Sequence, residues 1–252
     1  AVVKLRSEGK LYVEDGGTLE AEGTEADSVV FTSIKDDAVG GDTNGDGSES
    51  TPSKGDWHRI HFLEGGEGTL DHTIVRYGGG AVTPYDPRKH MLVLQGSSPT
   101  VVNSRIARSG RDGIYVSGRE DQSATPTIEG NRFEENGSEG LRIADAGGMV
   151  QDNVFVGNGR AVYVSQSENQ ASPAPTIVGN TGSGNGTNGI RWRGDLAGPE
   201  TVWSVNEGLP HVLQSYGSRV PDSTTLTVEA GAVVKLRSEG KLYVEDGGTL
   251  EA

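Results

Sequence analysis

An internal repeat is the feature that most constrains this chain. Residues 1–21, AVVKLRSEGKLYVEDGGTLEA, return without a single change as residues 232–252, which gives a period of 231 residues. Identity over such a stretch indicates a tandem array. We interpret residues 1–252 as a single continuous segment, in which residues 1–231 form one full repeat and residues 232–252 begin the next. An overlap introduced by design is the alternative.

A shorter period lies inside the long one. Stretches that begin at His72, Ser104, Asn131, Asn153 and Asn180 superimpose on their turns, at steps of 32, 27, 22 and 27 residues. A solenoid of helices would hold its repeat length, whereas a β-solenoid can lengthen a loop without disturbing its stacked strands. The variable step therefore favours stacked β coils.

Composition supports a thin β structure with a narrow core. The chain has 39 glycines, four phenylalanines and no cysteine. Only 33% of its residues are hydrophobic, which is too few for one thick core. Short alternating runs such as Ile114 to Val116 are separated by Gly, Asn, Asp and Ser, a pattern typical of strands and tight turns.

These features carry a family resemblance. The Asn-Gly turns and the phrases LTVEAGAVVKL (226–236) and GDWHRI (55–60) resemble right-handed parallel β-helix repeats of the pectate-lyase-like superfamily. The likeness is closest to the long repetitive proteins that bacteria and archaea secrete or display on their surface. It covers nearly the whole chain and implies an all-β fold, a right-handed parallel β-helix with three short strands per rung. At about 25 residues per coil, the repeat would hold roughly nine rungs and rise about 40–45 Å. The superfamily includes lyases, hydrolases, epimerases, adhesins and inert stalks, so function does not follow from fold.

Equivalent positions in stacked rungs lie about 4.8 Å apart and form ladders. We expect Asn136, Asn158 and Asn185 to form a turn ladder that continues to Ser109 and Tyr77, because asparagine tolerates tight turns. Asn136 and Asn185 also lie in glycosylation sequons, which a sugar can use only if the side chains face outward.

The insertion at residues 35–56 is acidic and glycine-rich. It contains the pattern D-x-N-x-D-G, in which Asp42, Asn44, Asp46 and the Ser48 carbonyl match the first half of a calcium loop. The twelfth position is Ser53 instead of a bidentate carboxylate. The predicted Ca²⁺ site therefore borrows ligands, with Asp36 and Asp37 foremost, and Glu49 and Asp56 as further donors. An acidic surface loop without a fixed ion is the alternative.

One outward column is a candidate binding surface. Tyr115, Arg142, Tyr163 and Arg191, preceded by Thr83, would form a Tyr/Arg stripe that contacts a glycan or a neighbouring fibre. A solvated β face is the plainer interpretation. We expect Trp192 in the core, and Trp57 and Trp203 in the core or at its rim.

The sequence favours no enzymatic chemistry and names no catalytic residue. The polygalacturonase phrases NTD, GHG and RIK are absent, and the pairs Asp36–Asp37 and Glu134–Glu135 do not resemble an acid/base couple. The net charge of −14 argues against nucleic acid as a partner, and no apolar run approaches the length of a membrane span.

We therefore expect a structural module of a long extracellular or cell-surface filament, stalk or adhesin shaft, stabilised by calcium. Its partners would be further copies end to end, with neighbouring fibres or glycans at the side. A polysaccharide-binding adhesin or a polysaccharide lyase or hydrolase is the alternative. The two identical segments should lie at opposite ends in equivalent rungs, each leaving a β edge open.

Overall fold

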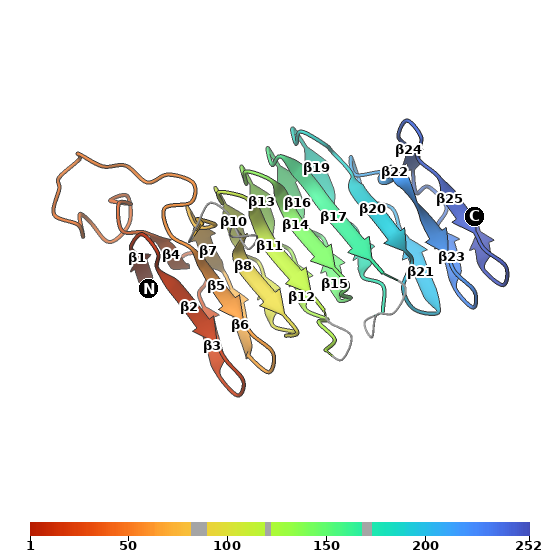
Figure 1. Ribbon diagram of the computed structural model, residues 1–252. Coiled ribbons are helices and arrows are strands. Elements are labelled where there is room, and N and C mark those ends of the chain that lie inside the picture. The colour runs from red at the N-terminus through yellow and green to blue at the C-terminus, as the bar shows by residue number, and fades with distance from the viewer. Residues whose placement is uncertain (82–89, 119–121, 168–172) are drawn as a thin grey trace.

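The computed structural model describes residues 1–81, 90–118, 122–167 and 173–252, with the backbone alone at residues 215 and 216. Short strands stack into rungs along one axis, with the N-terminus and the C-terminus at opposite ends (Figure 1). The described residues contain no helix, and their strands from β1 to β26 pair in parallel. The structure confirms the predicted all-β, three-sheet parallel β-helix.

The strands lie in three sheets, which we call sheets A, B and C. Sheet A contains β1 (Val2–Leu5), β4 (Val29–Ser33), β7 (Thr73–Arg76), β10 (Arg105–Ala107), β13 (Arg132–Glu134), β16 (Val154–Val156) and β19 (Thr181–Ser183). Sheet B contains β2 (Lys10–Val13), β5 (Arg59–Phe62), β8 (His90–Gln95), β11 (Asp112–Ser117), β14 (Glu139–Ala144), β17 (Arg160–Gln166), β20 (Ile190–Asp195), β22 (His211–Val220), β24 (Val234–Leu236) and β25 (Leu242–Val244). Sheet C contains β3 (Thr18–Glu22), β6 (Glu67–Asp71), β9 (Thr100–Val102), β12 (Thr127–Glu129), β15 (Met149–Gln151), β18 (Thr176–Val178), β21 (Glu200–Trp203), β23 (Thr225–Val228) and β26 (Thr249–Glu251).

Alternation along each strand sends every second side chain into a shared core. In sheet C one inward column runs through the whole stack in the order Ala21, Leu70, Val101, Ile128, Val150, Ile177, Trp203 and Val228. All but the last of these side chains are buried. The core is therefore a set of apolar ladders, which explains how so few hydrophobic residues suffice.

Sheet C keeps its register across the full period. The column that begins at Glu20 contains Thr69, Thr100, Thr127, Met149 and Thr176. Its last pair is Thr227 with Glu251, and Glu251 is the copy of Glu20. Because the first and last of the nine strands are copies, eight steps separate them. At about 4.8 Å per step, the rise per repeat is about 38 Å.

Sheet A ends early. Its inward column includes Phe133 and Phe155, whose rings stack at 4.7 Å, and it reaches Gly182 in the last strand. A Cβ at Gly182 would lie 2.3 Å from Leu209 Cδ2, so only glycine leaves room for this leucine to cover the end of the column. Beyond β19, a single bridge from Thr181 to Glu207 continues the sheet.

Sheet B changes register at its C-terminal end. Leu213 pairs with Trp192 and Ser218 with Gly194, so residues 214–217 of β22 bulge opposite residue 193. The bulge makes a new corner within β22. β24 then pairs with the first half of β22 and β25 with the second half.

The identical segments form the two end rungs, as predicted, with β2 and its copy β25 in sheet B and β3 and its copy β26 in sheet C, but the bulge changes the sheet of the third strand. They do share a conformation: Gly9 donates to the Arg6 carbonyl at 2.8 Å, and its copy Gly240 donates to Arg237 at 2.7 Å. They also lie at opposite ends (Figure 1). However, β1 belongs to sheet A, whereas its copy β24 belongs to sheet B. The two segments are in register in sheet C only.

A histidine is buried where the bulge begins. Trp192 Nε1 donates to His211 Nδ1 at 3.0 Å, and His211 Nε2 lies 2.9 Å from the Ser204 carbonyl. The Trp203 ring stacks on the imidazole at 5.1 Å. Both ring nitrogens are thus engaged in the neutral form, and burial lowers the pKa of His211 to about 4.

Candidate functional site

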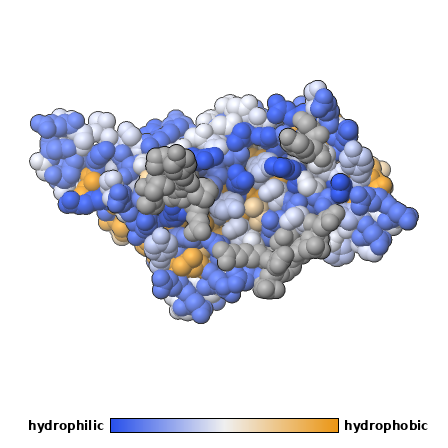
Figure 2. Space-filling model, in the orientation of Figure 1, coloured by the Kyte–Doolittle hydropathy of each residue, from blue (hydrophilic) through white to orange (hydrophobic). Residues whose placement is uncertain are grey.

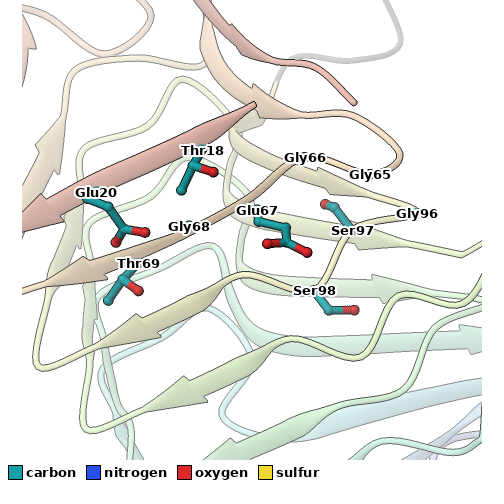
Figure 3. A pocket seen from close by; sticks show the side chains of 10 residues that line it. All are labelled: Thr18, Glu20, Gly65, Gly66, Glu67, Gly68, Thr69, Gly96, Ser97 and Ser98. Atoms are coloured by element: carbon teal, nitrogen blue, oxygen red, sulfur yellow. The ribbon is translucent and has the colours of Figure 1, made fainter. Parts of the chain in front are cut away.

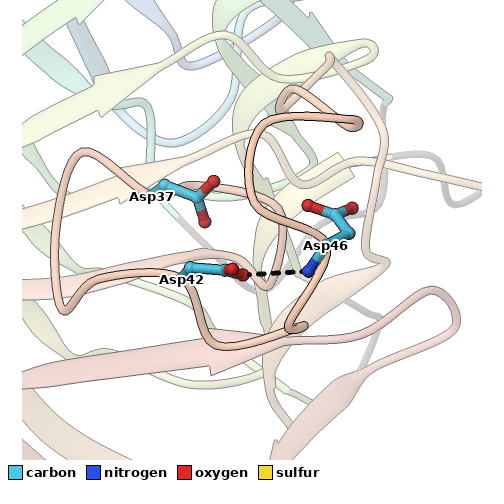
Figure 4. Close-up of side chains that lie close together, drawn as sticks. All are labelled: Asp37, Asp42 and Asp46. Carbon is cyan, nitrogen blue, oxygen red and sulfur yellow. Dashed lines mark hydrogen bonds between the residues drawn. The ribbon is translucent and has the colours of Figure 1, made fainter.

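The inserted loop gathers three carboxylates. Oxygens of Asp37, Asp42 and Asp46 lie within 4.8 Å of one another (Figure 4). Asp42 is held by the turn itself, because its carboxylate accepts hydrogen bonds from the amides of Gly45 at 2.8 Å, Asp46 at 3.3 Å and Gly47 at 2.8 Å. The bond from Gly47 is the main factor that lowers the pKa of Asp42. A preformed nest of this kind keeps the aspartate ionised.

Three buried oxygens in the loop are of interest for cation binding. Asp37 Oδ1, Asn44 Oδ1 and Asp46 Oδ1 are buried without a hydrogen bond among the described residues. The Asn44 amide nitrogen donates to Asp46 Oδ2 at 2.6 Å and to Ser50 Oγ at 2.9 Å. The Asn44 side-chain oxygen takes no part in these two bonds. Converging oxygen atoms without donors are what a hard cation requires.

Asp36 does not join this cluster, which corrects one predicted ligand. Its buried carboxylate accepts a hydrogen bond from Thr32 Oγ1 at 2.5 Å and pairs with Arg76 Nη2 at 2.5 Å. Arg76 lies far along the chain but in the next rung of sheet A, where it neutralises Asp36. Asp36 therefore anchors the base of the loop.

Two further predicted donors are also accounted for. Asp56 is held by Ser33 Oγ at 2.8 Å and Lys35 Nζ at 3.1 Å, so it too serves the base of the loop. Ser48 is exposed, in a turn that the Glu49 amide closes on the Asp46 carbonyl at 3.2 Å. The candidate ligands that the geometry brings together are Asp37, Asp42 and Asp46, and Asn44 is hydrogen-bonded to Asp46 beside them.

The structure places the three predicted ladder asparagines in consecutive rungs. The side chain of Asn136 donates to Asn158 Oδ1 at 2.8 Å, and that of Asn158 donates to Asn185 Oδ1 at 2.9 Å. All three are buried, so the glycosylation sequons at Asn136 and Asn185 have no outward amide. The ladder continues to Ser109, whose amide donates to Asn136 Oδ1 at 3.0 Å. We call this set the asparagine ladder.

A second ladder was missed at the sequence level. Asn131, Asn153, Asn180 and Asn206 repeat the same pattern at the turn between sheets C and A, with amide-to-amide bonds of 3.0, 2.9 and 2.9 Å. The signal was available, because the first three lie five residues before the asparagine ladder at the same steps.

The predicted Tyr/Arg stripe forms one outward column of sheet B. Tyr115, Arg142, Tyr163 and Arg191 pair in this order. Arg142 lies 5.7 Å from the Tyr115 ring centre and 5.2 Å from that of Tyr163, and Arg191 lies 5.6 Å from Tyr163. These distances are those of cation–π contacts.

The stripe begins differently from the prediction. Val93 pairs with Tyr115 where the alignment placed Thr83, which lies outside the described residues. The strand that pairs with β11 on this side is β8, and its residue opposite Tyr115 is Val93. The tryptophans Trp57, Trp192 and Trp203 are all core residues, exposed by 0, 2 and 0%.

A buried charged column also went unpredicted. His90 Nδ1 lies 2.9 Å from Asp112 Oδ2, and Glu139, in the next rung, pairs with Arg160 Nη2 at 2.6 Å. Burial opposes ionisation of Asp112, but His90 and the hydrogen bonds from Glu139 outweigh it and lower the pKa of Asp112 to about 2. The available signal was position: Asp112, Glu139 and Arg160 each lie two residues before a member of the paired core column Ile114, Leu141 and Val162. His90, Asp112 and Glu139 are buried, and Arg160 at the end of the column is partly exposed.

A polar hollow lies on the outer side of the first rungs. It has a volume of about 450 Å³ and is lined by Thr18, Glu20, Gly65, Gly66, Glu67, Gly68, Thr69, Gly96, Ser97 and Ser98 (Figure 3). Four of the lining residues are glycines. The two carboxylates, Glu20 and Glu67, come from the adjacent strands β3 and β6 of sheet C (Figure 3). Hydroxyl groups surround them, so the hollow offers acceptors for a polar ligand.

The chain belongs to the right-handed β-helix family. The model of the right-handed β-helix region matches residues 56–181, which is half of the chain. No curated protein matches the chain. Among solved structures, the chain is similar to the catalytic unit of a thermostable GH87 α-1,3-glucanase from Streptomyces thermodiastaticus strain HF3-3, with 14% identity and a TM-score of 0.30. The match covers 98% of this chain, and this chain spans about 64% of the length of the glucanase unit.

Among the described residues, no helix is long and apolar enough to cross a membrane.

Proposed function

We propose that this chain is a structural repeat that stacks end to end on further copies of itself, forming a filament, stalk or adhesin shaft outside the cell or on its surface. One observation carries the proposal: apolar side chains are exposed mainly at the two ends of the stack. Eight of the ten exposed large hydrophobic residues among the described residues lie in the identical segments, namely Val2, Val3, Tyr12, Val233, Leu236, Tyr243, Val244 and Leu250. Hydrophobic patches lie toward both ends of a mostly hydrophilic face (Figure 2).

The hydrogen-bonding edges support the same proposal. The terminal strands β1, β2 and β3 each pair with one neighbour only, as do β24, β25 and β26. Open parallel edges with apolar side chains favour the addition of another strand. A further rung at either end would satisfy these backbone groups and bury core residues that are now only partly covered, such as Leu11 and Leu242.

Charging one end should abolish association. We expect the chain to associate head to tail as its concentration rises, and we expect Leu236→Lys with Val244→Lys to leave it monomeric in analytical ultracentrifugation, since both exposed side chains lie in the last rung. Met149→Lys is the control, because Met149 is also an exposed apolar residue but lies on the side of the stack. Equal loss of association in both variants would rule out contact through the ends.

We further propose that the loop binds Ca²⁺ through Asp37, Asp42, Asn44 and Asp46. The support is the convergence of three carboxylates and the three unpartnered buried oxygens. The absent bidentate ligand at Ser53 implies weak binding, of the order of 0.1–1 mM, which suits extracellular modules. This agrees with a location outside the cell.

Calcium binding has a direct test. Isothermal titration with Ca²⁺ should show one site in the native chain, and Asp42→Asn with Asp46→Asn should abolish it. At 100 times its Kd, Ca²⁺ would stabilise the loop by about 2.7 kcal/mol. Asp27→Asn, at an exposed turn, serves as the control. Undiminished binding in the double variant would contradict the assignment.

A polysaccharide-binding or polysaccharide-active β-helix is the second candidate. The polar hollow with Glu20 and Glu67 favours it, because carboxylates and hydroxyl groups hydrogen-bond sugars. The acid pairs considered from sequence do not: Glu134 pairs with Arg105 and Arg132, and Glu135 with Arg108. If the second candidate holds, Glu20→Gln with Glu67→Gln will weaken glycan binding while end-to-end association stays intact.

A further inference from the structure

The shifted register at the C-terminal end aligns two features that are far apart in the sequence. The outward column of the Tyr/Arg stripe runs from Tyr163 to Arg191, Val212 and Lys235. Lys235 is the copy of Lys4, because residues 232–252 repeat residues 1–21. In a tandem array, the position of Lys4 in the next copy is therefore the position of Lys235 here.

Lys4 holds the acidic loop. Its Nζ donates to the Gly41 carbonyl, and a Cβ at Gly40 would lie 3.5 Å from Val2 Cγ1, so the loop crosses the outer face of β1. Beyond this point the loop projects past the N-terminal edge of the stack (Figure 1). In an array, that space belongs to the preceding copy.

We propose that residues 42–49 of each copy dock on the Tyr/Arg stripe of the preceding copy. This proposal rests on the proposed end-to-end assembly. The acidic loop would then cross the junction between two repeats and hold them together, and we call it the strap. The partner of the stripe is thus a second copy of this chain, and its contact residue is the exposed Glu49, whose carboxylate would lie opposite the guanidinium of Arg191.

The charges on the two sides are complementary. Arg191 Nε is buried without a hydrogen-bond partner among the described residues, and Arg191 Nη2 donates only to Gln214 Oε1, at 2.6 Å. Burial lowers the pKa of Arg191, and the charges of Arg160 and Arg237 lower it further. The partly buried guanidinium of Arg191 lies close to the cations of Arg160 and Arg237, so it would gain from a carboxylate in addition to Glu139. The loop supplies several on a chain whose net charge is −14.

The loop is long enough to reach the stripe. Arg191 lies two rungs from Lys235, about 10 Å along the axis at the usual strand spacing. Residues 42–49 leave Gly41 and return, and the turn that they form already projects past β1 in this direction (Figure 1). Tyr115, three rungs farther along the stripe, lies out of reach.

Calcium does not cancel the complementarity. Asp37, Asp42, Asp46 and Glu49 carry four negative charges, and one Ca²⁺ leaves a net charge of −2. Bound Ca²⁺ would fix the loop while the exposed Glu49 stays free for the stripe.

Engineered cysteines test the strap without background, because the chain has no cysteine. In a chain of two consecutive repeats, Arg191→Cys in the first copy and Glu49→Cys in the second should join within one chain under mild oxidation or with a short thiol cross-linker. Tyr115→Cys with the same Glu49→Cys is the matched control and should give at least tenfold less product.

The outcomes separate the strap from the assembly that it rests on. Solution scattering of the uncross-linked chain reports whether the two copies form one extended rod. A compact particle would overturn the end-to-end assembly and the strap together. An extended rod without a cross-link would overturn the strap alone. Cross-linked dimers, instead of an internal loop, would overturn it in favour of contact between fibres lying side by side.

Discussion

Asn158→Ala is expected to lower the free energy of unfolding by about 3–5 kcal/mol, a large fraction of the stability of an ordinary domain. The Asn158 amide donates to the Phe133 carbonyl at 3.0 Å and to Asn185 Oδ1 at 2.9 Å. Its oxygen accepts from the backbone and side-chain nitrogens of Asn136 at 3.1 and 2.8 Å. Alanine removes all four bonds in a buried place, where the Asn136 side chain keeps its bond to the Ile106 carbonyl but the Asn136 backbone amide loses this acceptor.

Urea unfolding at equilibrium measures this loss, and the exposed end of the ladder provides the control. Asn188 Oδ1 accepts from the backbone and side chain of Asn185 at 3.0 and 2.8 Å, but Asn188 is exposed. Water can replace it, so Asn188→Ala should cost about 1 kcal/mol. Losses of the same size at both sites would show that burial of the asparagine ladder is not the source of its stability.

Acidification should destabilise the C-terminal end through His211. The folded pKa of about 4 lies below the ordinary value of 6.5, so between these values the unfolded chain binds a proton that the folded chain does not. Stability therefore falls as the pH drops from 6.5 toward 4 and levels off below. A difference of about 2.5 pKa units corresponds to about 3 kcal/mol.

His211→Gln isolates this contribution from that of the carboxylates. Glutamine can accept from Trp192 and donate to the Ser204 carbonyl, as the neutral imidazole does, but it does not titrate. Unfolding curves at pH 7, 5.5 and 4 should diverge, with the native chain losing about 3 kcal/mol more than the variant. Parallel losses in the two proteins would contradict a buried neutral His211.

Ladders are the part of this fold that sequence predicts best. Asn136, Asn158 and Asn185 recur at matching turns, and repetition in a solenoid means stacking, so their neighbours follow from alignment alone. The Tyr/Arg stripe followed from the same frame. Each prediction used only local periodicity and the fixed spacing between rungs.

Features that depend on packing across rungs escaped the sequence. Asp36 was predicted as a calcium ligand, but Arg76 in the neighbouring rung takes its carboxylate, and nothing near either residue signals this pair. The bulge at residues 214–217 likewise arises where sheet A ends and sheet B turns a new corner. That corner moves β24 onto sheet B, although its sequence is identical to that of β1.

Solution scattering of chains with one, two and three consecutive repeats tests the end-to-end stack most directly. Eight steps of about 4.8 Å predict that each added copy lengthens the particle by about 38 Å while its cross-section stays constant. Particles that thicken at constant length as copies are added would show that the repeats pack side by side, and the axial assembly proposed for this protein would be wrong.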